Sequence, residues 1–99
     1  MDYEKIAEIR YQTDSFIVAT VSTTRNTYID VFERPEIEAE AEARSMTVEA
    51  VIASRSVLWM DLVYHYGDDA DEETEVEKWV EHYRAALTSE PSSNVQNIT

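Results

Sequence analysis

Two histidines and a dense run of carboxylates are the side chains of this sequence best suited to acid–base chemistry or metal binding. His65 and His82 lie 17 residues apart, whereas a zinc-binding pair on one helix needs a spacing of about four residues. With no cysteine and one glycine, the chain offers no zinc–thiolate site, no glycine-rich phosphate loop and no nucleophile elbow. We therefore expect both histidines at the surface or at a strand edge, and we predict a non-enzymatic protein without a cofactor.

The acidic run that begins at Asp68 matches a calcium-binding loop only in part. Read as an EF-hand loop from Asp69, its third and fifth positions are acidic, but Thr74 replaces the required glycine and Val80 replaces the bidentate glutamate. Carboxylates in the first turn of a helix interact favourably with its dipole, which explains three or four of these acids. Seven acids lie between Asp68 and Glu77, so we expect no metal site and a further role for the remaining carboxylates.

Charge is the strongest feature of the sequence. Its 21 Asp and Glu against 8 Lys and Arg give a formal net charge of −13. Nucleic acids and anionic membranes attract basic surfaces, so the charge argues against direct binding to either. The acids gather in two blocks, which we interpret as the surface for a basic partner. These candidate residues are Glu36, Glu38, Glu40 and Glu42 in the first block and Asp68, Asp69, Asp71, Glu72, Glu73, Glu75 and Glu77 in the second.

Three strands are predicted in the first third of the chain. Residues 5–13 fit either a helical stripe or an alternating strand, and we favour the strand. The apolar, β-branched run Phe16–Val21 predicts a central strand covered on both faces. It forms a hairpin over about residues 15–33 with the strand Tyr28–Phe32, and Asn26 is expected to adopt a left-handed conformation in the turn.

Two helices are predicted in the rest of the chain. Pro35 suits the first helical position, and the Ala- and Glu-rich run 36–54 favours a helix by propensity, although part of it alternates like a strand. Residues 45–47 form helices less readily and are expected to mark a kink or a break. The second helix follows the acidic run and has an apolar stripe from Val76 to Leu87.

A fourth strand is predicted over residues 57–66, because Leu58, Met60, Leu62, Tyr64 and Tyr66 alternate onto one face. Val57, Trp59 and Val63 would give the other face an apolar surface that needs a helix or a partner. In the alternative, residues 47–66 form one helix after the strand 27–33 and the helix 35–44, which is the order of a ribbon-helix-helix dimeric regulator. That strand lacks the Lys and Arg needed to contact DNA.

The sequence therefore predicts a small single α+β domain over residues 1–88, followed by a flexible polar C-terminal tail over 89–99. A mostly antiparallel sheet of three or four strands packs with two helices in the order β-β-β-α-β-α. The first residues lack a basic region and an apolar run, so no signal peptide is expected and the cytoplasm is the predicted location, that of the host if the protein is viral.

Size, charge and the absence of catalytic motifs are similar to those of small virus-encoded nucleic-acid mimics, including some anti-CRISPR and anti-restriction proteins. The first hypothesis is therefore an inhibitor that occupies the basic groove of a nucleic-acid-binding protein or complex. The alternative is a salt-adapted interaction domain, because acids are abundant and only Lys5 and Lys78 are lysines. A homodimer is compatible with either.

Overall fold

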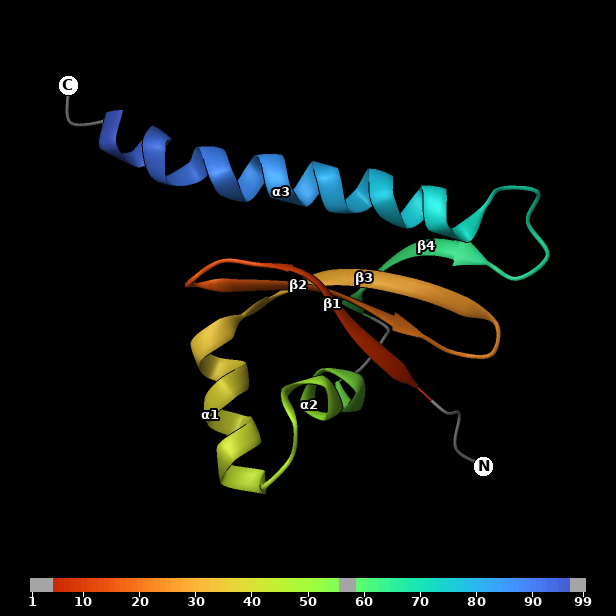
Figure 1. Ribbon diagram of the computed structural model, residues 1–99, viewed down its shortest axis with the longest axis horizontal. Coiled ribbons are helices and arrows are strands. Elements are labelled where there is room, and N and C mark those ends of the chain that lie inside the picture. Colours follow the sequence, from red (N-terminus) through yellow and green to blue (C-terminus); the bar gives the residue numbers. More distant parts are fainter. Residues whose placement is uncertain (1–4, 56–58, 97–99) are drawn as a thin grey trace.

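The computed structural model describes residues 5–55 and 59–96, which form one antiparallel sheet and three helices (Figure 1). The strands lie side by side in chain order: β1 (Ile6–Gln12), β2 (Phe16–Ser22), β3 (Asn26–Glu33) and β4 (Asp61–His65). The helices are α1 (Arg34–Arg44), α2 (Val48–Ser54) and α3 (Glu72–Gln96). The α+β class and the antiparallel sheet are confirmed. The element order is β-β-β-α-α-β-α, because the first predicted helix is divided into two.

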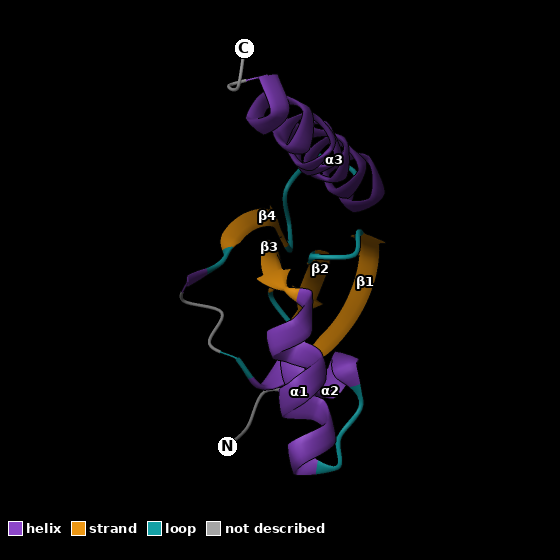
Figure 2. Cartoon of the chain, turned by 90° about the vertical axis from the view of Figure 1, so that its left-hand side faces the viewer, coloured by secondary structure: helices purple, strands orange, loops and turns teal. Residues whose placement is uncertain are grey.

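Helices cover both faces of the sheet, with α1 and α2 on one side and α3 on the other (Figure 2). Successive side chains of a strand point to opposite faces, so β2 contributes to two cores. Its Ile17, Ala19 and Val21 pack with α1 and α2, whereas Val18 packs with α3. All four are at most 1% exposed, which confirms that β2 is a central strand covered on both faces.

Threonine side chains stabilise the β1–β2 and β2–β3 hairpin turns. The Thr13 hydroxyl accepts hydrogen bonds from the amides of Ser15 and Phe16, and Thr23 does the same for Arg25 and Asn26. Among the described residues only Ser45 and Gly67 have a positive φ. The expectation of a left-handed Asn26 was therefore wrong, because the threonine hydroxyl satisfies the turn amides instead.

The predicted break at residues 45–47 is a complete separation between α1 and α2. Ser45 adopts a left-handed conformation with φ 55°, and the amides of Ser45 and Met46 donate to the carbonyls of Glu42 and Ala41. Thr47 then caps α2, because its hydroxyl accepts from the Ala50 amide at 3.0 Å. Pro35 lies in the first turn of α1, where its missing amide costs no hydrogen bond.

The fourth strand is shorter than predicted, and it rules out a single helix over 47–66. β4 pairs with β3 from Asn26 to Ile29, so β3 has neighbours on both sides and is not free to form the ribbon of a ribbon-helix-helix dimer. A register shift places Val63 in the core beside α3 and leaves Leu62 52% exposed. Val63 thus lies on the face opposite Met60, as predicted, whereas Tyr64 packs in the same core as Val63, so the predicted alternation was wrong at Tyr64. Val57 and Leu58 lie outside the described residues.

Helix α3 begins where the sequence predicted but ends later, at Gln96. The sequence predicted a polar tail from residue 89, yet the helical backbone continues through Pro91. In the described part of the chain no helix is both long and apolar enough to cross a membrane.

Candidate partner-binding surfaces

The first acidic block lies along α1, and half of it is neutralised by arginines. Ile37 and Ala41 turn towards the core, so the glutamates project on either side of this buried stripe. Glu38 pairs with Arg34 at 2.9 Å. Glu40 contacts Arg44 at 2.6 Å and Arg55, the residue that directly follows α2, at 2.7 Å. The hydrogen bond from Arg44, with added attraction from Arg55, holds the pKa of Glu40 below its ordinary value. Glu36 and Glu42 remain exposed.

Several acids of the second block build the connection between β4 and α3. Asp68 accepts a hydrogen bond from the His65 amide at 3.2 Å. Asp71 caps α3 by accepting from the Thr74 amide at 3.1 Å and from the Thr74 hydroxyl at 2.9 Å. The buried Thr27 donates to Glu72 and thereby connects the start of α3 to β3. These carboxylates have structural partners, as the helix-terminus explanation predicted for part of the block.

An exposed carboxylate row consists of Asp69, in the loop before α3, and of Glu73, Glu77 and Glu81 on α3. Within the described residues, no cation lies at ion-pair distance from Asp69, Glu73 or Glu77, and Glu75 contacts Lys78 only at 3.5 Å. Positions four apart share one face of a helix, so Glu73 and Glu77 lie in line and Glu81 continues the line. Glu81 was missed at the sequence level, although its spacing of four from Glu77 was a usable signal.

This carboxylate row borders a groove of about 450 Å³ between α3 and β1. Two arginines also line the groove. Arg10 is bonded to Thr20 at 2.9 Å and to Glu8 at 2.8 Å. Arg84 lies over the Tyr11 ring at 5.2 Å and 3.7 Å from Glu81. Both cations therefore have partners of their own, which leaves the outer carboxylates accessible.

The two acidic blocks do not form one surface. α1 packs against one face of the sheet and α3 against the other, and the β4–α3 connection lies at the end of the molecule away from α1 (Figure 1). A flat or convex partner would therefore use one block at a time. The block on α3 has fewer compensating cations and is the better candidate surface.

Neither histidine forms a site with the features of an active centre. His65 Nδ1 lies 2.6 Å from Asn26 Oδ1, and the His82 ring makes edge contacts with Trp79 and Tyr83. Tyr83 donates to Asp61 at 3.0 Å, and burial together with this bond raises the pKa of the phenol above its ordinary value. Over residues 5–55 and 59–96, no three His, Cys, Asp or Glu side chains are grouped closely enough to hold a metal ion.

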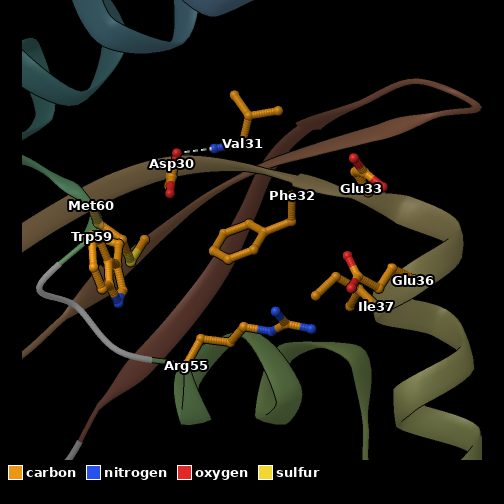
Figure 3. A pocket seen from close by; sticks show the side chains of 9 residues that line it. All are labelled: Asp30, Val31, Phe32, Glu33, Glu36, Ile37, Arg55, Trp59 and Met60. Carbon is orange, nitrogen blue, oxygen red and sulfur yellow. Dashed lines mark hydrogen bonds between the residues drawn. The ribbon is translucent and has the colours of Figure 1, made fainter.

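A second pocket, of about 460 Å³, lies between the end of β3, the start of α1, and the residues that precede β4. Phe32 and Trp59 line it together with Asp30 and Arg55 (Figure 3). Burial raises the pKa of Asp30 above its ordinary value, and the nearby Asp61 adds to the effect. No sequence signal predicted this pocket, because Arg55, Trp59 and Met60 join residues 30–37 only after folding.

Comparisons with protein-family models, curated proteins and solved structures find no match to this chain.

Proposed function

We propose that this protein is a non-enzymatic acidic inhibitor that occupies the basic groove of a nucleic-acid-binding protein or complex, as virus-encoded anti-CRISPR and anti-restriction mimics do. The observation that carries the proposal is the carboxylate row of Asp69, Glu73, Glu77 and Glu81. These side chains are exposed, and the first three have no ion-pair partner among the described residues. Uncompensated charge opposes folding, so its retention is best explained by a partner of opposite charge.

The spacing of the row suits the mimicry of a phosphate backbone. Four residues of helix rise by about 6 Å, which separates Glu73 from Glu77 and Glu77 from Glu81 along α3, whereas Asp69 lies in the loop before the helix. Phosphates on one DNA strand advance by about 3.4 Å along the axis and are farther apart along the backbone. Lys and Arg side chains are long and flexible, so a groove that follows phosphates can also follow this helix.

The partner is thus a basic nucleic-acid-binding protein, and the protein itself contacts neither nucleic acid nor a membrane. No cofactor or metal takes part in such binding. We place the protein in the cytoplasm, or in the host cytoplasm if it is virus-encoded, because a nucleic-acid-binding partner is accessible there.

The proposal is tested by capture from a cell lysate, followed by displacement with nucleic acid. Immobilised protein is expected to retain a nucleic-acid-binding protein at low salt, to release it at high salt, and to release it when excess duplex DNA or RNA is added. Displacement is the decisive step, because it requires both ligands to use the same groove. A retained protein that nucleic acid does not displace would contradict the proposal.

Two triple variants of equal charge locate the surface. The test variant carries Asp69→Lys, Glu73→Lys and Glu77→Lys, and it is expected to lose capture with an unchanged circular dichroism spectrum. The control variant carries Asp14→Lys, Glu42→Lys and Glu49→Lys, all at exposed positions away from α3. Equal loss of capture by both variants would mean that only net charge matters and would remove α3 from the site.

A further inference from the structure

The pocket at the end of β3 has features that the carboxylate row does not explain. Its walls are formed by β3, by the start of α1, by Arg55 at the end of α2 and by Trp59 and Met60 before β4. Figure 3 shows the rings of Phe32 and Trp59 and the guanidinium of Arg55 around the same opening. The pocket thus combines aromatic surface with charged groups.

Trp59 is the most conspicuous part of this pocket. Its side chain is 83% exposed, whereas Phe32 is partly buried against the core beneath α1 and α2. A solvent-exposed indole is a surface on which planar groups stack. Trp is also one of the residues most often found at the energetic centre of protein interfaces.

Carboxylates outnumber cations in the pocket. Asp30, Glu33 and Glu36 line it, and Arg55 is its single cation among the lining residues. Arg55 already donates to Glu40, which lies outside the pocket lining, at 2.7 Å. The lining thus has three carboxylates against one guanidinium, and that guanidinium is already paired outside the pocket. The pocket is therefore complementary to a cation.

The edge of β3 beside the pocket offers an added strand one hydrogen-bond donor fewer. Pairing with β4 ends at Ile29, so the stretch from Asp30 to Glu33 has a described neighbour only in β2. The Asp30 carboxylate accepts the hydrogen bond of the Val31 amide at 2.7 Å, which removes a donor that an incoming strand would need (Figure 3). A side chain that enters the pocket is therefore a better occupant than an added strand.

A second copy of this chain is a poor occupant, because each copy has a formal charge of −13. A basic partner has the complementary charge, and arginine fits the pocket better than lysine. Its planar guanidinium stacks on aromatic rings and pairs with carboxylates through two hydrogen bonds, whereas an ammonium group acts as a point charge.

We propose that this pocket receives an arginine side chain of the partner, with the guanidinium stacked on Trp59 and paired with the carboxylates of Asp30 and Glu36. This inference rests on the proposed function, since it takes the partner to be basic. The pocket then supplies a specific anchor, whereas the carboxylate row on α3 supplies distributed attraction.

The test uses N-acetyl-argininamide as the probe and the indole N–H signals of isotope-labelled protein as the readout. The chain has two Trp, so Trp79 is an internal reference. The probe is expected to shift the Trp59 signal in a saturable way, whereas the neutral citrulline analogue leaves it in place. Glu36→Gln is expected to weaken probe binding roughly two- to fivefold, the size of one exposed cation–π or ion-pair contact. Glu42→Gln, on the same helix but outside the pocket, is expected to have no effect.

The Trp59→Ala variant provides a second measure of probe binding, and the backbone amide signal of Phe32 is its readout. The substitution removes an exposed side chain and is expected to weaken binding by a similar factor while the fold is kept. An unchanged Trp59 signal, or equal shifts by the arginine and citrulline probes, would overturn the inference. So would a dimer in sedimentation that Trp59→Ala dissociates, because the pocket would then belong to a second copy.

The inference and the proposed function fail in different ways. If duplex DNA displaces a captured partner but the arginine probe leaves Trp59 unaffected, the pocket assignment is wrong and the proposed function stands. If the probe binds at Trp59 but no nucleic-acid-binding protein is captured, the pocket assignment is supported and the proposed function is wrong.

Discussion

Asp30 is a carboxylate whose charge opposes folding at neutral pH. Burial and the nearby Asp61 raise its pKa above its ordinary value of 3.8, even though the Val31 amide donates to it. The folded state therefore holds the proton more tightly than the unfolded state does. As pH rises through the interval between the ordinary and the raised pKa, this group lowers the free energy of unfolding, and the cost persists above that interval.

We predict that Asp30→Asn stabilises the protein at neutral pH. Asparagine keeps an oxygen that accepts from the Val31 amide but carries no charge. The difference in the free energy of unfolding between the variant and the wild type should shrink at pH values below the ordinary pKa. There, Asp30 is protonated in both the folded and the unfolded state. Urea unfolding at neutral and acidic pH measures this, with Glu42→Gln as the exposed control. A difference in the free energy of unfolding that stays constant across the pH range would show that the Asp30 charge is not the cause.

Asp71 is the acid of the second block with the clearest structural role, because it caps α3 through Thr74. We predict that Asp71→Ala lowers the free energy of unfolding by about 0.5–2 kcal/mol. Asp69→Ala, in the same loop but without a partner among the described residues, should change it by much less. Equal losses in the two variants, measured by denaturant unfolding, would mean that the cap contributes nothing.

At the scale of elements, the separation of α1 from α2 depends on the left-handed Ser45. A side chain on an L-residue is strained in this conformation, whereas glycine adopts it freely. We predict that Ser45→Gly raises the free energy of unfolding by about 0.5–1 kcal/mol, after the larger backbone entropy of glycine is counted. Ser45→Ala removes the same hydroxyl but keeps the Cβ, so it should give no gain. A gain in the alanine variant would show that strain at Ser45 is not the cause.

The separation of these helices also assembles the pocket. A continuous helix over 36–54 would not bring Arg55 back beside Glu40 and the end of β3, as the turn at 45–47 does. The same turn lets α1 and α2 cover one face of the sheet together. The weak helix formers at 45–47 thus position side chains of the proposed arginine pocket.

For the whole molecule, the central question is whether a charge of −13 is compatible with folding in dilute buffer. The Debye length is about 30 Å at 0.01 M salt, and the molecule measures 53 × 39 × 18 Å, so repulsion then acts across most of it. The two cores and the ion pairs of α1 oppose this repulsion.

We predict that the protein loses stability on desalting but stays folded, as the hypothesis of a nucleic-acid mimic requires. Circular dichroism at falling salt concentration is the measurement. Cooperative unfolding at low ionic strength would favour the alternative of a salt-adapted domain, and the acidity would then need no basic partner.

Local patterns were enough to predict the three N-terminal strands, the weak point at 45–47 and the start and apolar stripe of α3. Alternation and helical periodicity depend on neighbouring residues, which the sequence displays directly. The net charge and its two blocks are also properties of the sequence alone. The end of α3 at Gln96 was not predicted, because Pro91 and the polar residues around it are typical of the end of a helix.

Tertiary structure decided which carboxylates are available to a partner. Glu40 is neutralised by Arg55, 15 positions away, and Glu72 is bonded to Thr27, 45 positions away. The register shift in β4 likewise depends on its pairing with β3, and it places Tyr64 in the same core as Val63. The pocket at Trp59 exists only where four separate elements meet. Such contacts follow from the packing of distant segments, for which a single sequence carries no local signal.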